Sequence, residues 1–158
     1  MSSAGLIIDT NLLLLLVIGL VEDGRHISKS DRLNGYSQED YQIVVRFMGR
    51  FKSVFTTHYI ATEVSNLIDL GGELGSRVYE AARLLLSEFQ QIESTIVDDS
   101  ASPYFLKFGL TDASLISLVS DYTVLTDDGP LSGVLYAVNG DNVVQLEVAK
   151  SIVAASSR

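Results

Sequence analysis

Two spacings of apolar residues divide the chain into strands and helices. Short apolar runs predict strands over residues 5–9, 53–56, 92–97, 122–126 and 143–146. Apolar residues that recur every three or four positions predict helices over 12–21, 37–51, 58–70, 73–90, 103–108, 112–121 and 147–156, and another that starts near Pro130. Strands that alternate with helices imply a parallel sheet covered on both faces. No repeat, linker or low-complexity tract interrupts this order, which fits one domain over residues 1–158.

The most apolar segment is the run LLLLLVIGLV from Leu12 to Val21. It is too short to cross a membrane, which needs roughly 20 apolar residues, and Asp9 and Asn11 limit it on one side. The start of the chain has neither the basic residues nor the cleavage site of a secretory signal. We therefore expect a helix buried on most sides, capped by Asn11.

Residues 23–36 are polar and form an excursion longer than a tight turn. The next helix starts at Ser37, where the stretch from Ser37 to Asp40 resembles a capping box. This helix carries one apolar stripe that includes Val44 and a second that includes Phe47, so it is expected to be covered on two sides.

Acidic residues follow two of the predicted strands. Asp9 ends the first strand, and Asp127 and Asp128 follow the strand 122–126. In parallel sheets, ligands bind beyond the carboxyl ends of the strands. Alternation along an extended chain gives Thr126 and Asp128 the same side, which favours Asp128 over Asp127 as a partner of Asp9.

Two further acids lie on apolar helical stripes. Glu63 shares its stripe with Ile60 and Leu67, and Asp112 shares its face with Leu115. No Lys or Arg lies within a few residues of these acids. Carboxylates about 4 Å apart repel by roughly 4 kcal/mol at an effective dielectric of 20, so a cluster of them needs bound positive charge. Oxygen ligands without His or Cys favour Mg²⁺ or Mn²⁺.

Composition narrows the chemistry further. The 158 residues contain no Cys, which excludes thiol chemistry and thiolate zinc sites and makes a reducing cytoplasm the expected compartment. His26 and His58 are too few and too far apart for a catalytic pair, and the GxSxG, GxGxxG and GxxxxGK[ST] motifs are missing. Each acid alone also has an ordinary interpretation as a helix cap, a first-turn acid or a turn residue. The four acids together favour a metal site over these separate interpretations.

The net charge of −9 argues against a broadly basic surface for nucleic acid. It conceals a basic stretch from Arg25 to Lys52, which has six basic and three acidic residues. Within it, Arg46 and Arg50 are four residues apart on the polar side of their helix. They are candidates to contact phosphates at the rim of the acidic pocket, with a merely solvated face as the alternative.

The acids lie in four short motifs that together resemble those of PIN-domain nucleases. In chain order, the motifs are Asp9-Thr10-Asn11, Ala61-Thr62-Glu63-Val64, Gly109-Leu110-Thr111-Asp112-Ala113 and Leu125-Thr126-Asp127-Asp128. Each motif alone is common, but the resemblance covers nearly the whole chain in order. The chain departs from the commoner pattern at Gly129-Pro130 and in its long 23–36 excursion, which concerns the substrate rather than the metal site.

The resemblance implies a three-layer α/β/α sandwich with a central parallel sheet of four to five strands. It also implies a ribonuclease that uses Mg²⁺ or Mn²⁺. It places the catalytic metal ligands at Asp9, Glu63, Asp112 and Asp128, with Asp127 as the alternative to Asp128. Asn11 and Thr126 would orient carboxylates by hydrogen bonds. The family includes toxins of toxin–antitoxin pairs, for which an antitoxin-like protein would be a partner.

Two other functions stay open at this point. The first is a catalytically silent PIN-like module that binds protein or RNA through the apolar surface of the 37–51 helix. The same surface, and the leucine helix, also make a homodimer plausible. The second is a phosphatase or receiver-like domain with Asp9 as phosphoacceptor, which is disfavoured because Lys150, the Lys near the late strands, lies inside the last helix.

Overall fold

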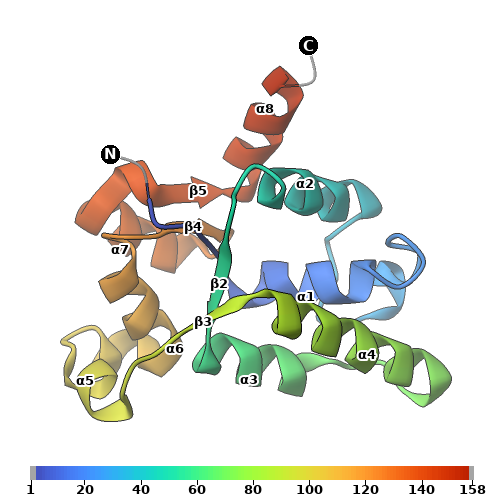
Figure 1. The fold of residues 1–158 in the computed structure, drawn as a ribbon, viewed down its shortest axis with the longest axis horizontal. Helices are drawn as coiled ribbons and strands as arrows, with labels where there is room; N and C mark the ends of the chain where they lie inside the picture. Colours follow the sequence, from blue (N-terminus) through green and yellow to red (C-terminus); the bar gives the residue numbers. More distant parts are fainter. Residues whose placement is uncertain (1–2, 157–158) are drawn as a thin grey trace.

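The computed structural model describes residues 3–156 and contains one parallel sheet (Figure 1). Its strands are β1 (Leu6–Ile8), β2 (Val54–Thr57), β3 (Gln90–Ile92), β4 (Thr123–Thr126) and β5 (Val143–Gln145). They pair in the order β3-β2-β1-β4-β5, and every pair is parallel. The chain first builds the sheet outward from β1 to β3, and then returns to the other side of β1 for β4 and β5.

Helices cover both faces of this sheet. They are α1 (Thr10–Gly19), α2 (Gln38–Met48), α3 (His58–Leu67), α4 (Gly72–Glu88), α5 (Ile96–Ala101), α6 (Phe105–Leu118), α7 (Gly129–Asn139) and α8 (Leu146–Ser156), with 3-10 turns η1 (Ile27–Lys29) and η2 (Gly140–Asn142). In Figure 1, α1, α2 and α4 lie to one side of the strands and α5, α6 and α7 to the other. In agreement, α1 contacts α2, α3 and α4, whereas α6 contacts α5 and α7. The predicted three-layer α/β/α sandwich is confirmed.

The leucine run forms α1, which is the centre of the core. Every residue from Leu12 to Gly19 is buried, as expected for a helix that is apolar on all sides. Its cap is Asp9, whose side chain accepts a hydrogen bond from the Thr10 N–H, so the expected cap at Asn11 is wrong. Within residues 3–156, no helix is both long and apolar enough to cross a membrane.

Helix α2 is covered on two sides, as its two stripes predict. Ser37 and Asp40 form the predicted capping box at its start, and α2 packs against both α1 and α8. Ile43 and Phe47 are buried. The apolar faces on which the sequence predicts a homodimer or a partner contact are therefore covered by helices of the same chain.

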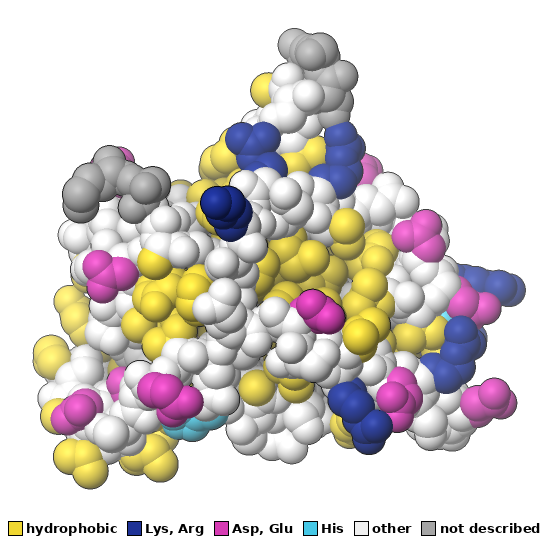
Figure 2. Space-filling model, viewed as in Figure 1, with side chains coloured by type: hydrophobic (Ala, Val, Ile, Leu, Met, Phe, Trp, Pro, Cys, Tyr) yellow, Lys and Arg dark blue, Asp and Glu magenta, His cyan; other side chains and the backbone are white. Residues whose placement is uncertain are grey.

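The most exposed apolar side chains lie around α5 and the start of α6, at the lower left of Figure 2. Val97 is 76% exposed and Leu106 is 91% exposed. The strand predicted over 92–97 is wrong at this point, because β3 ends at Ile92 and α5 begins at Ile96. The Thr95 hydroxyl accepts a hydrogen bond from the Asp98 N–H, and this cap favours a helix over the alternating pattern.

Helix α6 bends at Gly109, which has φ 81° and ψ −176°. This backbone conformation belongs almost only to glycine. The bend separates the two helices that the sequence predicts over 103–108 and 112–121. It lies at Gly109, two residues before the predicted cap at Thr111. Thr111 is therefore not the helix cap that the sequence predicts, and its hydroxyl is directed to Glu63.

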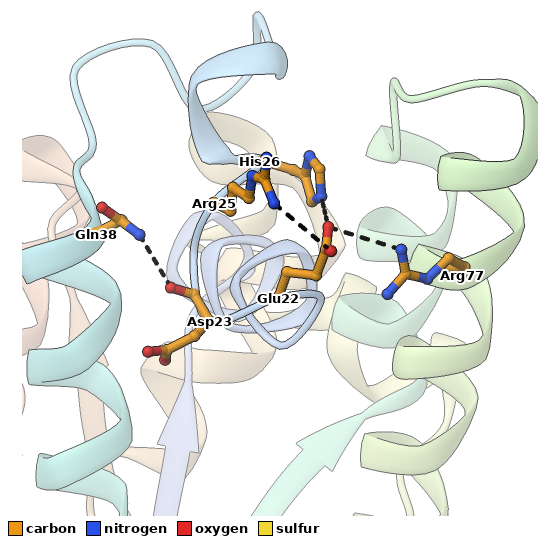
Figure 3. A network of polar contacts seen from close by, with 6 residues as sticks. All are labelled: Glu22, Asp23, Arg25, His26, Gln38 and Arg77. Atoms are coloured by element: carbon orange, nitrogen blue, oxygen red, sulfur yellow. Dashed lines mark hydrogen bonds and ion pairs between the residues drawn. The ribbon is translucent and has the colours of Figure 1, made fainter.

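The polar excursion leaves the end of α1 through three consecutive residues with positive φ, Glu22, Asp23 and Gly24. Figure 3 shows the Glu22 carboxylate between His26 of the excursion and Arg77 of α4, with the Arg77 guanidinium 3.7 Å away. The excursion is thus tied to a helix on its own side of the sheet.

Two further contacts hold the excursion. Asp69, after α3, accepts hydrogen bonds from the Ser30 hydroxyl (2.7 Å) and the Arg32 N–H (3.1 Å). On the α2 side, the Gln38 side-chain amide donates to the Asp23 carbonyl (3.1 Å; Figure 3). The excursion is therefore a fixed part of the surface, although it contains only one 3-10 turn.

Candidate active site

The strand order makes a topological switch point between β1 and β4. These strands are neighbours, but the chain leaves β1 toward β2 on one side and leaves β4 toward β5 on the other. In parallel sheets, the carboxyl ends of the strands at such a switch point are where ligands bind. Asp9 follows β1, and Asp127 and Asp128 follow β4. Side chains from distant parts of the sequence therefore meet at this edge.

Asp9 is the most buried of these acids, with 8% of its surface exposed. One carboxylate oxygen accepts a hydrogen bond from the Thr10 N–H (2.7 Å), and the other accepts one from the Thr126 hydroxyl (2.8 Å). The pKa of Asp9 is raised to about 6, mainly by burial and in part by the charges of Asp128 and Asp127, whereas the two hydrogen bonds lower it. None of the groups that shift the pKa of Asp9 is positively charged. The ionised carboxylate therefore has no cation among them to stabilise it.

Asp128 is held as the N-cap of α7. Its carboxylate accepts a hydrogen bond from the Leu131 N–H (3.0 Å), and its own N–H donates to the Thr126 hydroxyl (3.1 Å). Thr126 thus connects Asp9 and Asp128. The charge of Asp128 raises the pKa of both Asp9 and Asp112.

Asp127 takes a different environment from its neighbour. It is exposed, and its carboxylate accepts a hydrogen bond from the Tyr36 hydroxyl at the end of the excursion. Its charge adds to the pKa shift of Asp9 but is not among the causes of the shift of Asp112. These contacts agree with the choice of Asp128 as the fourth member of the cluster.

Helices α6 and α3 supply the other two acids. Asp112 is half-buried beside the buried Leu115, and its pKa is raised to about 7 by burial and by the charges of Asp9, Asp128 and Glu63. Glu63 itself is exposed, and its carboxylate accepts a hydrogen bond from the Thr111 hydroxyl. The four predicted acids therefore come close enough for their charges to interact, although Glu63 is less buried than its apolar stripe suggests.

The donor chemistry of this cluster fits Mg²⁺ or Mn²⁺, since every candidate ligand is a carboxylate. Within the described part of the chain, no three His, Asp or Glu side chains converge closely enough to hold one ion together. Mg²⁺ is commonly held by one or two carboxylates and otherwise by water and substrate phosphates, and the cluster is suited to that mode.

The other predicted site residues differ in their positions. Thr126 makes the predicted hydrogen bond to a carboxylate. Asn11 lies exposed in the first turn of α1, where the Thr10 N–H holds Asp9 instead. Lys150, inside α8 as predicted, forms ion pairs with Asp40 of α2 and with Glu147 of its own helix.

The structure does not bring Arg46 and Arg50 to the acidic cluster. Arg50 lies shortly before β2, toward the amino end of the sheet, and donates to the Ser156 hydroxyl at the end of α8 (2.6 Å). Arg46 borders a shallow hollow together with Asp23 and Tyr41. Neither arginine is among the causes of the pKa shifts of the acids. Their predicted place at the rim of the pocket is therefore corrected.

Sequence reasoning missed Tyr36. Its hydroxyl contacts Asp127, and its pKa is raised by burial, by this hydrogen bond and by the charges of the surrounding acids, Asp9 included. A polar segment of irregular path gives no periodicity from which this contact could be predicted. The long excursion between α1 and α2 is the one signal in the sequence.

A hollow of about 790 Å³ lies at the opposite edge of the sheet. It is bordered by Asp121 and Tyr122 before β4 and by Asn142 before β5. We place the candidate site at the carboxyl edge because the perturbed acids gather there.

Comparisons of the chain with models of known families, with curated proteins and with solved structures find no match. The likeness to PIN-domain nucleases therefore rests on the four motifs of this sequence.

Proposed function

We propose that this protein is a PIN-like ribonuclease that depends on Mg²⁺ or Mn²⁺ and hydrolyses RNA phosphodiester bonds at the cluster of Asp9, Glu63, Asp112 and Asp128. The observation that carries the proposal is the electrostatic interaction among these acids. Burial and the charges of Asp128 and Asp127 raise the pKa of Asp9, burial and the charges of Asp9, Asp128 and Glu63 raise that of Asp112, and no cation is among the causes. Divalent ions would supply this positive charge and would in turn attract the phosphate of the substrate.

The chain's own residues orient the carboxylates. Thr126 and the Thr10 N–H fix both oxygens of Asp9, and the Leu131 N–H fixes one oxygen of Asp128. Each of these acids keeps lone pairs for an ion. When bound, a divalent ion would polarise the phosphate and lower the pKa of a water molecule.

The other two acids of the cluster lie on helices. Asp112 lies on α6 beyond the Gly109 bend, and Glu63 on α3 is positioned by the Thr111 hydroxyl. Their helices contact each other, so a change in one acid alters the field at the other. Because every acid in the cluster is a candidate metal ligand, we assign no separate general base.

The test is Mn²⁺ binding by calorimetry together with cleavage of a panel of RNAs. We expect Asp9→Asn and Asp112→Asn to lose both while keeping the wild-type circular dichroism spectrum. Asp141→Asn, an exposed acid in η2, is the matched control and should behave as wild type. Mn²⁺-dependent cleavage retained in both site variants would contradict the proposal. Mn²⁺ binding without cleavage of any RNA would instead support a silent binding module.

A further inference from the structure

We propose that the excursion of residues 23–36 is the RNA-binding surface of this protein, and that Tyr36 stacks on a base next to the phosphate at the acidic cluster. This inference rests on the proposed function and assigns its substrate contacts. In place of Arg46 and Arg50, which the sequence predicts as phosphate contacts, it assigns the RNA contacts to another part of the basic stretch from Arg25 to Lys52.

The position of Tyr36 carries the first step. Its hydroxyl donates to Asp127, which directly precedes the cluster residue Asp128. The tyrosine therefore lies at the edge of the acidic cluster. The residue is only half-buried, so part of it is accessible to solvent. Aromatic rings in such positions stack on the unpaired bases of single-stranded RNA.

Two hollows that share Tyr36 and Ser28 carry the second step. One, of about 320 Å³, is also bordered by Asp31 and Asn34. The other, of about 200 Å³, is also bordered by Arg25 and Gln38. Both hollows offer polar groups that match the hydrogen-bonding edges of bases. A strand whose phosphate lies at the cluster would extend its neighbouring nucleotides into these hollows.

Charge carries the third step. Residues 23–36 contain three basic side chains, Arg25, Lys29 and Arg32, against two acids, Asp23 and Asp31, in a chain whose net charge is −9. All three are exposed. The side chain of Arg25 is 74% exposed and lies 3.9 Å from Glu22, a pairing that contributes little in water. The contacts of Glu22 and Asp69 hold the excursion in place, so these cations form a fixed surface for phosphates.

Fluorescence anisotropy with a labelled single-stranded RNA of about ten nucleotides tests the ring, because this length exceeds one stacking site. Binding is measured in Ca²⁺, and a gel verifies that the RNA stays intact. We expect Tyr36→Ala to weaken binding about tenfold, from the loss of one stacked base. Tyr36→Phe, which keeps the ring, should stay within about twofold. Tyr136→Ala, at an exposed tyrosine of α7, is the control and should bind as wild type.

The salt dependence tests the charges with a matched pair of double variants. We expect Arg25→Gln/Arg32→Gln to lower the slope of log K against log salt by about 1 to 1.5, measured between about 50 and 200 mM salt. Arg46→Gln/Arg50→Gln removes the same charge from the neighbourhood of α2 and should leave the slope unchanged. Because both excursion arginines are exposed, this arm stands even if Tyr36→Ala does not fold.

Three results would overturn the inference: no RNA binding by the wild type, wild-type affinity in a folded Tyr36→Ala variant, or equal slopes in the two arginine pairs. These results are separable from a failure of the proposed function. RNA binding that depends on Tyr36, without Mn²⁺-dependent cleavage, would contradict the nuclease function but support the RNA-binding surface. Mn²⁺-dependent cleavage by a protein whose RNA affinity does not change in Tyr36→Ala would support the nuclease function but contradict the RNA-binding surface.

Discussion

The Thr126 hydroxyl donates a 2.8 Å hydrogen bond to the carboxylate of Asp9, across 117 positions of sequence. Asp9 follows β1, and Thr126 is the last residue of the neighbouring strand β4 and is completely buried. The same hydroxyl accepts the Asp128 N–H. One threonine thus fixes the geometry of two acids and lowers the pKa of Asp9 against the effect of burial.

Replacing this threonine with valine should therefore change both stability and ion binding. Thr126→Val keeps the shape but removes the hydrogen bond, so we expect the pKa of Asp9 to rise above its value of about 6. A lost bond to a charged group lowers the free energy of unfolding at pH 8 by about 2 kcal/mol, measured in urea. Mn²⁺ affinity at pH 6 should fall because more of Asp9 is protonated. Thr126→Ser, which keeps the hydroxyl, should behave as wild type; a valine variant with unchanged stability and affinity would show that the bond is unimportant.

Two glycines offer a test of the bend in α6. Gly109 has positive φ, whereas Gly133 lies within α7, and a methyl group at either position would meet no atom within 4 Å. Gly109→Ala should destabilise the fold by about 1–3 kcal/mol, because an L residue is strained there. Gly133→Ala should stabilise it by about 0.5–1 kcal/mol, because alanine loses less backbone entropy in a helix. Urea unfolding measures the change in the free energy of unfolding for each variant. A Gly109→Ala variant that is more stable than wild type would contradict the positive φ at the bend.

Local patterns predicted the parts of the fold that depend on neighbours in sequence. The leucine run identified the buried helix α1, and Ser37 with Asp40 identified the capping box of α2. The meeting of Asp9 and Asp128 was also predictable, because the carboxyl ends of parallel strands share one edge. Each of these inferences uses a spacing of a few residues or a general rule of topology.

Contacts that depend on the path of the chain could not be predicted in this way. The bond between Tyr36 and Asp127 spans 91 positions and depends on how the excursion folds back from α1. The cap at Thr95 favours a helix where an alternating pattern predicts a strand. Arg50 donates a hydrogen bond to Ser156 of α8 and does not reach the acidic cluster. A helical face can be read from the sequence, but the element that it faces is set by tertiary packing.

The raised pKa of Asp112 makes stability depend on pH. Its pKa is about 7 in the folded protein against an ordinary 3.8, so the folded state holds this proton to higher pH than the unfolded chain. The free energy of unfolding therefore falls as pH rises from about 4 to about 7 and changes no further above it. Without metal at pH 8, we expect Asp112→Asn to be more stable than wild type by about 1–2 kcal/mol, since water screens a half-buried group.

The same comparison at pH 4 supplies the control. Both proteins carry a neutral group at position 112 under that condition, so the stability difference should be close to zero. Mn²⁺ should raise the melting temperature of wild type at pH 8 and leave that of Asp112→Asn nearly unchanged. An Asp112→Asn variant that is less stable than wild type at pH 8 in EDTA would show that the carboxylate is not repelled by its neighbours.

Asp127 and Asp128 are adjacent in sequence, and their different contacts predict opposite results for the same substitution. Asp128→Asn keeps an oxygen that can accept the Leu131 N–H, so the cap of α7 survives while the charge is lost. We expect its Mn²⁺-dependent cleavage to fall about a hundredfold or more, because even residues that only orient metal ligands contribute 10–100-fold. Asp127→Asn keeps an acceptor for the Tyr36 hydroxyl and removes a charge that is not among the causes of the Asp112 shift, so cleavage should stay close to wild type. Initial rates with one RNA at saturating Mn²⁺ compare the two variants directly. Equal losses would mean that both acids bind the ion, and a larger loss in Asp127→Asn would assign the fourth ligand to Asp127 and require Tyr36 to release it.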